Sequence, residues 1–249
     1  MARLEAKVIG LCDAAAHAGH LPENCANCMS RHLAVCAGLD PRQLAHLTQH
    51  VTHRRLSGGQ ALFREGDVAD QVFTVTSGAI KQYKLLADGR CQVTGFYFMG
   101  DLIGMPEGKT YPVTAEALAD VTLCAFPRAH IAGLIRQYPS LADRVLLKFQ
   151  REVTTAQDQM LSLGRLTAEE RIARFLLMLM DKAPNCAHAD GTLTLHMKRT
   201  DIADYLGLTV ETVSRMFTKL RNAGVVGAES AGRIQISGRG RLAEMAGPD

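Results

Sequence analysis

The 249-residue sequence has no tryptophan, few aromatic residues (5%) and no long apolar stretch. No segment approaches the roughly 18 consecutive apolar residues that a membrane-spanning helix needs. The longest apolar run near the N-terminus, residues 8–16, is interrupted by Asp13 and is followed by no small-residue cleavage site. We therefore expect no signal peptide, no membrane partner and a cytoplasmic location. The net charge of +3 is too small to indicate nucleic-acid binding by the chain as a whole, so any such function must be local.

What the sequence does contain is a substantial apolar fraction (47%) and seven cysteines. The apolar fraction is sufficient for packed cores, which excludes wholesale disorder. In a reducing compartment an odd number of cysteines points to metal binding, redox chemistry or simple burial rather than to structural disulfides. Four of the cysteines lie within the first 36 residues.

Residues 41–136 carry the pattern of a β-rich domain. Short β-type runs such as QVFTVTSG, AIKQYKLL, CQVTGFYF and DVTLCAF alternate with glycine-containing turns at intervals of about 8–12 residues. This spacing predicts an antiparallel barrel or jelly roll.

Helical periodicity begins after Pro139. Between Leu141 and Leu163 apolar residues recur at spacings of three and four, which predicts a long amphipathic helix. The candidate dimer contacts on its stripe are Val145, Phe149, Val153, Ala156 and Met160. A seam between two chains and packing on the helix's own domain explain this periodicity equally well. A second helix is expected over residues 168–182.

Residues 199–224 predict a helix-turn-helix. Thr200 can cap a first helix that Gly207 ends, and Thr209 can cap a second that Gly224 ends. Four residues of the second helix share its outward face because they lie at positions i, i+3, i+4 and i+7. These residues, which we expect to face DNA together with the capping Thr209, are Glu211, Ser214, Arg215 and Thr218.

The chemistry of this outward face suits the reading of bases. Arg215 can donate two hydrogen bonds to guanine, Glu211 can accept one from cytosine, and Ser214 can contact either a polar edge or a thymine methyl group. Residues 196–241 carry eight Lys/Arg against four Asp/Glu, which gives this segment a local charge of +4. The sequence therefore predicts double-stranded DNA as a partner.

The N-terminal cysteines form a triad, Cys25, Cys28 and Cys36, within twelve residues. Such short spacings let the thiolates surround a metal with little loop-closure cost. With His32 or His20 as the fourth ligand the site would suit zinc, and with a distant cysteine it would suit an iron–sulfur cluster. A thiol switch without metal is a third interpretation, and spacing alone does not choose among them.

Several motifs together resemble the CRP/FNR superfamily of bacterial transcription regulators. They are FREGD at 63–67, SGAIKQY at 77–83, GFYFMGDLIG at 95–104, DVTLCAFPR at 120–128 and LGLTVETVSR at 206–215. The VETVSR helix and the cysteine triad are similar to the oxygen-sensing FNR branch. The resemblance implies a [4Fe–4S] cofactor held by Cys25, Cys28, Cys36 and, from the β-roll, Cys124. Cys91 lacks this motif context, and Cys12 and Cys186 are expected to be spare thiols.

The resemblance also implies an α+β fold. Its parts are a cluster-binding segment (1–40), an antiparallel β-roll of the jelly-roll or cupin-like kind (41–137), a dimerisation helix (138–164) and a winged helix-turn-helix domain (165–249). We find no catalytic constellation and expect no enzyme activity. Two alternatives remain open, a zinc-stabilised or thiol-redox regulator without a cluster and, with less support, a haem- or nitric-oxide-sensing one.

As a mechanism, the resemblance implies that the cluster promotes a homodimer at low oxygen. The dimer would bind an inverted repeat of the TTGAT-N4-ATCAA kind and activate RNA polymerase through surface loops near residues 81–90 and 184–191. Cyclic nucleotide is not expected as a ligand. The relevant positions, Gly100-Asp101 and Lys109-Thr110, lack the guanidinium fork that suits a phosphate.

Overall fold

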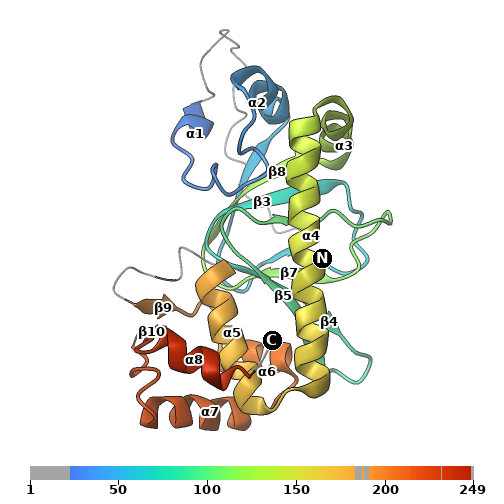
Figure 1. The fold of residues 1–249 in the computed structure, drawn as a ribbon. Coiled ribbons are helices and arrows are strands. Elements are labelled where there is room, and N and C mark those ends of the chain that lie inside the picture. Colours follow the sequence, from blue (N-terminus) through green and yellow to red (C-terminus); the bar gives the residue numbers. More distant parts are fainter. Residues whose placement is uncertain (1–22, 183–186, 188–190, 231, 248–249) are drawn as a thin grey trace. The chain divides into compact units, whose positions relative to one another are not determined.

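The computed structural model describes residues 23–182, 187, 191–230 and 232–247 (Figure 1). In this part of the chain no helix is both long and apolar enough to cross a membrane. The chain divides into two compact units. The first holds the residues up to Lys84 together with Gly95–Glu152, and the second holds Leu85–Thr94 together with the residues from Val153 onward. The segment boundaries expected at residues 40, 137 and 164 stay predictions.

Two four-stranded sheets form the predicted β-roll, and the sequence-predicted runs at 71–78, 79–86, 91–98 and 120–126 all contain strands. The first sheet has the order β1 (Thr52–Leu56), β8 (Val121–Pro127), β3 (Gln71–Ser77) and β6 (Leu102–Ile103). The second has the order β2 (Ala61–Phe63), β7 (Thr114–Ala117), β4 (Ile80–Leu85) and β5 (Cys91–Tyr97). The pairings β1–β8, β8–β3, β3–β6, β2–β7 and β7–β4 are antiparallel, as predicted for the roll.

Each side of strand β8 faces a different hydrophobic core, because side chains alternate along a strand. Leu123 and Ala125 pack into the core inside the roll. Phe126 and the partly buried Cys124 pack into a second core on the other face of the sheet. The alternation therefore decides that Cys124 points away from the interior of the roll.

The second core joins the cysteine segment to three helices of the same unit. The helices are α2 (Pro41–Thr48), α3 (Arg128–Gln137) and the beginning of α4 (Pro139–Arg165). Val35 beside Cys36, Leu47 of α2, Ile131 of α3 and Leu141 of α4 all belong to this core. The segment that contains the N-terminal cysteines is thus packed in the same hydrophobic core as the beginning of α4.

Helices α2 and α3 were not predicted, because the whole of residues 41–136 was interpreted as β-rich. Local signals explain α2. The Asp40 carboxylate accepts a hydrogen bond from the backbone N–H of Gln43, the Gln43 side-chain oxygen accepts one from the backbone N–H of Asp40, and Pro41 occupies the first turn. The predicted long helix is confirmed, and α4 begins two residues before and ends two residues after the expected span.

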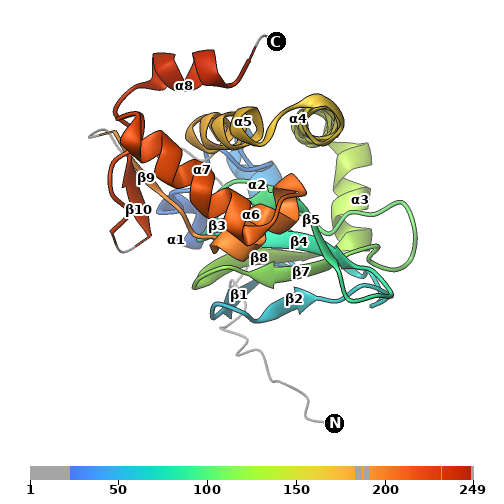
Figure 2. The ribbon, with the colours of Figure 1, turned by 90° about the horizontal axis from the view of Figure 1, so that it is seen from below.

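The second unit contains the C-terminal helices and a small β-ribbon (Figure 2). Its elements are α5 (Ala168–Lys182), β9 (Thr192–Thr194), α6 (Arg199–Leu206), α7 (Val210–Asn222), β10 (Arg233–Gln235) and α8 (Arg239–Met245). Helix α5 packs against α7 and α8. The antiparallel β9–β10 ribbon supplies a wing next to the helix-turn-helix. A winged helix-turn-helix is therefore present as expected.

Candidate metal centre and DNA-binding surface

The four predicted cluster ligands line a single cavity of about 440 Å³ in the first unit. Cys25 lies in the short helix α1 (Glu23–Ala26), Cys28 and Cys36 lie in the turns that follow, and Cys124 comes from β8. Cys25 and Cys124 are almost one hundred residues apart in the sequence. They line the same cavity because the N-terminal segment packs on the outer face of the β1–β8–β3 sheet. Three cysteines of the N-terminal segment and one cysteine of the sheet therefore line the same cavity.

The turns between Cys25 and Cys36 are held by backbone hydrogen bonds. The N–H of Cys28 donates to the carbonyl of Cys25, and the N–H of Ala34 donates to the carbonyl of Ser30. The hydroxyl of Ser30 lies 3.1 Å from the sulfur of Cys28. Hydrogen-bonded turns, rather than a long helix or strand, therefore position Cys25, Cys28 and Cys36 at the cavity.

Gly100 sets how closely the cysteine segment approaches the roll. Its φ is +89°, and a Cβ placed there would lie 2.4 Å from the Cβ of Leu33 and 3.0 Å from the Leu33 carbonyl carbon. Leu33 lies between Cys28 and Cys36, so a side chain at position 100 would push this loop away from the sheet.

Gly100→Ala is expected to destabilise the protein by at least about 2 kcal/mol, because backbone strain and a backbone collision add. Gly89→Ala is the matched control: Gly89 has φ +86° but nothing within 4 Å of its Cβ position, so only strain remains. Chemical denaturation of both variants measures the difference. An equal loss of unfolding free energy in both variants would show that the Leu33 loop moves aside without an energetic cost.

The cavity is shaped differently from the site of a single bound ion. In the part of the chain that the structure describes, no group of three His, Cys, Asp or Glu converges to hold one metal ion. A zinc site brings its sulfur atoms to about 2.3 Å from one centre, whereas each cysteine of a [4Fe–4S] site binds a separate iron atom around a larger body. The four cysteines that line the cavity supply the ligand type that an iron–sulfur cluster uses.

Among the described residues, the remaining cysteine and the candidate zinc ligand His32 do not line the cavity. Cys91 is half-buried on β5 and is not among the residues that line the cavity, and His32 is exposed and also absent from the lining. Cys12, Cys186 and His20 lie outside the described residues. Burial, and secondarily the neighbouring Cys28, raise the pKa of Cys36, so the metal-free thiol is protonated at neutral pH.

Two polar residues beside Cys124 were not predicted. In the sheet register Cys124 lies between His53 on β1 and Thr74 on β3, and all three line the cavity. The Nδ1 of His53 lies 3.7 Å from the Cys124 sulfur, and burial lowers the pKa of His53. The hydroxyl of Thr74 is buried without a hydrogen-bond partner among the described residues. Only the strand register, which sequence alone does not reveal, could have identified them.

A second, smaller cavity of about 190 Å³ lies in the roll where Tyr97, Tyr111 and Glu152 contribute to its lining. The ring of Tyr111 stacks on Phe63 with centroids 3.8 Å apart, and Tyr97 donates a hydrogen bond of 2.5 Å to Glu152. The positions compared with a phosphate clamp in the sequence analysis, Gly100-Asp101 and Lys109-Thr110, are not among the residues that line this cavity. Lys109 and Thr110 are exposed and absent from the lining, and the carboxylate of Asp101 accepts from the Phe98 N–H and lies 3.5 Å from Lys148.

Helix α7 exposes the face that was expected to read DNA. Val213, Phe217 and Leu220 are buried. The side chains on the opposite face are exposed, namely Glu211, Ser214, Arg215 and Thr218, as is the capping Thr209. Thr209 accepts a hydrogen bond from the backbone N–H of Thr212 as predicted, and Gly207 ends α6 in the left-handed conformation. Thr200 does not cap α6: Lys198 occupies that position, and its N–H donates to Asp201.

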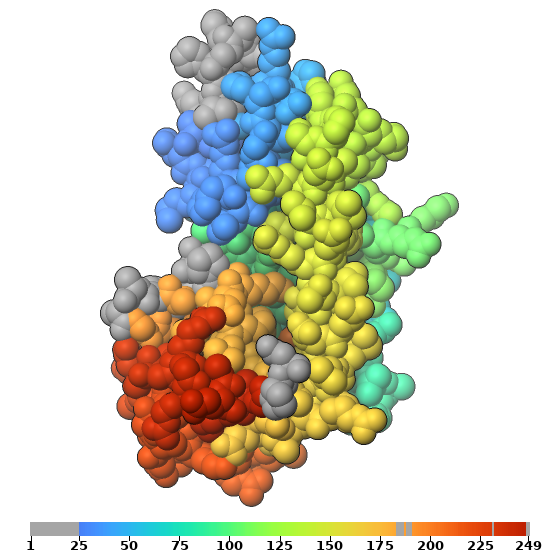
Figure 3. Space-filling model, in the orientation of Figure 1, coloured from blue at the N-terminus to red at the C-terminus, as the bar shows by residue number. Residues whose placement is uncertain are grey.

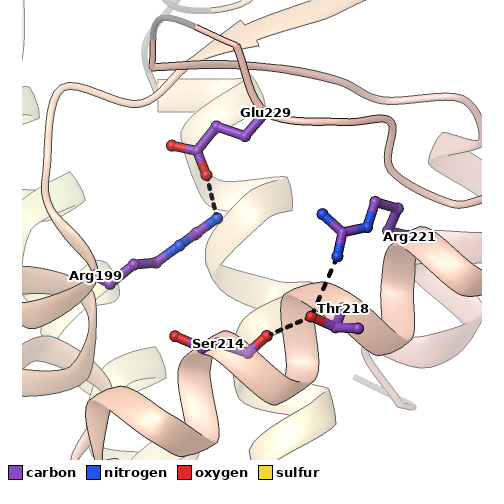
Figure 4. Close-up of polar contacts among 5 residues, drawn as sticks. All are labelled: Arg199, Ser214, Thr218, Arg221 and Glu229. Carbon is purple, nitrogen blue, oxygen red and sulfur yellow. Dashed lines mark hydrogen bonds and ion pairs between the residues drawn. The ribbon is translucent and has the colours of Figure 1, made fainter.

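Local contacts order part of this face (Figure 4). Arg215 donates to the hydroxyl of Thr212 at 3.2 Å, and Thr218 donates to the carbonyl of Ser214 at 3.0 Å. Backbone hydrogen bonding at the helix N-terminus, Thr209 and the charge of Arg215 lower the pKa of Glu211, so its carboxylate is ionised at neutral pH. An ionised Glu211 can only accept hydrogen bonds, which is the role that a cytosine amino group requires.

The wing is fastened to the helix-turn-helix by Arg199 at the beginning of α6. Its guanidinium lies 3.3 Å from the centroid of the Phe217 ring. It also lies 2.5 Å from the carboxylate of Glu229, the ion pair drawn in Figure 4. Phe217 belongs to α7 and Glu229 to the turn before β10. One side chain thus connects the recognition helix and the wing within this unit.

Helix α4, part of which is visible on the surface in Figure 3, carries a row of exposed apolar side chains. Large apolar side chains that remain exposed include Leu146, Phe149, Val153 and Met160, and Ala156 continues their three- and four-residue spacing. Val145 differs from the expected set, because it is 6% exposed and packs in the core that contains the cysteine segment. Leu146, 56% exposed, takes its place on the surface.

A β-roll followed by a long helix and a winged helix-turn-helix defines a class of DNA-binding transcription regulators with an N-terminal sensor domain. Residues 53–138 match the family model of the cyclic nucleotide-binding domain, and residues 170–245 match that of the Crp-like helix-turn-helix domain. The chain belongs to the CRP/FNR family, whose members are DNA-binding regulators and not enzymes.

Similar proteins include named activators. The chain is 41% identical to the transcriptional activatory protein AadR of Rhodopseudomonas palustris over 80% of this chain and 84% of that protein. It is 35% identical to the transcriptional activator protein FnrL of Cereibacter sphaeroides over 90% and 92% of the two chains. Among solved structures, FixK2 from Bradyrhizobium japonicum has a TM-score of 0.75 and 35% identity, covering 80% of this chain and 98% of that one.

Proposed function

We propose that this transcription regulator responds to oxygen through a [4Fe–4S] cluster held by Cys25, Cys28, Cys36 and Cys124. The observation that carries the proposal is the single cavity that all four line. One further feature supports it. The buried hydroxyl of Thr74, which has no hydrogen-bond partner among the described residues, belongs to the lining of the same cavity.

When bound, the cluster supplies thiolate bonds that tie the N-terminal segment to β8 and that oxygen can break. The chain's own packing relates this tie to the long helix, because Val35 beside Cys36 shares a core with Leu141 and Val145 of α4. Fixing the cysteine segment therefore favours one arrangement of the first turns of α4. Release of the segment loosens the same core.

The exposed stripe of α4 is proposed as the dimer interface. Its residues, Phe149, Val153, Ala156 and Met160, follow the spacing of a two-helix seam, and Leu146 extends it in place of Val145. A two-fold dimer places two copies of α7 for adjacent major grooves of an inverted repeat. Low oxygen thus favours the dimer and binding to a TTGAT-N4-ATCAA-like sequence.

Arg215, Glu211 and Ser214 are proposed to read the bases of each half-site, with Thr209 and Thr218 beside them. All five are exposed on or next to the first two turns of α7, where a recognition helix contacts base edges. Because similar proteins are named activators, we further propose RNA polymerase as a partner. The candidate contact is the loop near residues 81–90, where Leu85 at the end of β4 and the following Leu86 are exposed. The second predicted contact loop, near residues 184–191, lies outside the described residues except at positions 187 and 191.

Purification without oxygen, followed by visible spectroscopy and metal and sulfide analysis, tests the cofactor. A brown protein with about four iron and four sulfide per chain that bleaches in air supports the proposal. A colourless, air-stable protein with one zinc per chain would leave a DNA-binding regulator with a structural N-terminus. A metal-free protein whose DNA binding follows thiol oxidation would favour the thiol switch.

Arg215→Ala is expected to weaken binding to the inverted repeat by about 1–3 kcal/mol and to relax the preference for one guanine per half-site. Competition binding with single-base variants of the site measures both effects. Arg221→Ala, which removes the same charge from the C-terminal part of α7, should weaken all sequences alike. A uniform loss for Arg215→Ala as well would make Arg215 a phosphate contact.

A further inference from the structure

Cys124 has a polar neighbour on each side in the sheet. His53 of β1 and Thr74 of β3 are both its register partners. Side chains directly opposite each other in antiparallel strands have Cβ atoms about 4.5–5.5 Å apart and point to the same face. Both neighbours line the cavity together with the sulfur of Cys124. Two groups that can donate hydrogen bonds therefore flank the one ligand that the β-roll contributes.

The hydroxyl of Thr74 is the more informative of the two. Thr74 is 3% exposed, and its oxygen has no hydrogen-bond partner in the part of the chain that the structure describes. A buried hydroxyl without a partner is destabilising, whereas valine would fill the same volume without that cost. A threonine at this position is explained if its partner is a group that occupies the cavity.

His53 supplies the second donor. Its Nδ1 lies 3.7 Å from the Cys124 sulfur, within the range of a hydrogen bond to sulfur. A neutral imidazole carries one N–H, which can be placed on the nitrogen that faces Cys124. Thr76 and Thr122 also line the cavity, but their hydroxyls already bond to each other at 2.7 Å.

We infer that Thr74 and His53 donate hydrogen bonds to sulfur at the Cys124 corner of the bound cluster and thereby slow its attack by oxygen. The inference rests on the proposed function. Hydrogen bonds to sulfur withdraw electron density and raise the reduction potential of an iron–sulfur cluster. A higher potential opposes the loss of one electron from the cluster to dioxygen, which is reduced to superoxide. The two residues are positioning residues that set oxygen sensitivity without binding iron.

The first test compares Thr74→Val with Thr76→Val in the cluster-containing protein. After anaerobic purification, each is mixed with air-saturated buffer and the loss of visible absorbance is followed. Thr74→Val is expected to bleach about three- to tenfold faster than wild type at unchanged initial iron content, the factor that one ordinary hydrogen bond can supply. Thr76→Val should bleach at the wild-type rate. His53→Phe should resemble Thr74→Val.

The second test uses metal-free protein and so does not depend on a loaded cluster. Thr74→Val should raise the melting temperature by about 2–4 °C, because it removes an unpaired buried hydroxyl. Thr76→Val should lower it, because that hydroxyl is bonded to Thr122. A lower melting temperature for Thr74→Val would mean that the hydroxyl has a protein partner, and would overturn the inference.

The outcomes separate this inference from the proposed function. Wild-type protein that contains iron and sulfide, with equal bleaching rates for wild type and Thr74→Val, overturns the hydrogen-bond assignment alone. Wild-type protein without iron and sulfide overturns both. Faster bleaching of Thr74→Val, together with the higher melting temperature of its metal-free form, supports both.

Discussion

Cys124→Ala protein isolated without oxygen is expected to fall from about four iron atoms per chain to less than about one. Cys124 is the only proposed ligand that comes from the β-roll, so its removal leaves the N-terminal segment without a covalent tie to the sheet. Anaerobic DNA binding should fall to the level of the air-exposed wild type. Iron and sulfide analysis, with binding to the inverted repeat measured on the same samples, checks both expectations.

Cys91→Ala is the matched control, since Cys91 is a half-buried strand cysteine that does not line the cavity. It should retain iron, colour and anaerobic DNA binding. A complete, air-sensitive cluster in Cys124→Ala would show that the fourth ligand is another residue. Loss of iron in Cys91→Ala with retention in Cys124→Ala would reverse the assignment of the two strand cysteines.

The candidate metal site illustrates what sequence can and cannot reveal. The triad of Cys25, Cys28 and Cys36 is visible because its spacing is local, whereas spacing alone could not connect Cys124 to it. That connection depended on a family resemblance, and the cavity now supports it. The partners His53 and Thr74 were missed because cross-strand neighbours depend on register, and a shift of one residue would turn each to the other face.

The helices show the same division between local and distant information. Strong periodicity predicted α4 nearly to its ends, and the threonine cap and the glycine turn predicted α7. Helix α3 was missed because a ten-residue helix that follows directly on β8 has no side-chain cap to announce it. Val145 was predicted to lie on the dimer stripe, but it is buried and the next residue, Leu146, is exposed. A spacing of three and four residues does not show which of two neighbouring apolar residues faces the core that contains α3 and the cysteine segment.

One hydrophobic core connects the N-terminal cysteine segment with the beginning of α4. The core beneath the cysteine cavity contains Val35, Leu134 and Leu141, so the segment that holds three ligands and the base of α4 are buried together. Protein interiors are close-packed, and a displaced segment cannot leave its neighbours unchanged. Under the proposed function, thiolate bonds to a cluster would need to stabilise only one packing of this core to bias the exposed stripe of α4 toward pairing.

Val153→Glu should abolish dimer formation and, with it, specific binding to the inverted repeat. Val153 is 56% exposed at the centre of the α4 stripe. In a two-fold dimer each substitution acts twice, which buries two carboxylates of like charge close together. Burying an unpaired charge costs several kcal/mol, so the dimer dissociation constant should rise by at least about a hundredfold. Sedimentation velocity of the anaerobic protein and DNA binding measure the two effects.

Thr154→Glu provides the comparison, because it places the same charge on the next residue, which is exposed but lies off the stripe. It should dimerise and bind DNA as wild type does, with its iron content unchanged. Val153→Glu should also keep its iron, because the cavity is lined by residues outside the stripe. A monomer that retains iron but no longer binds the repeat would separate sensing from DNA binding. A Val153→Glu dimer of undiminished stability would require another surface of the chain to form the interface.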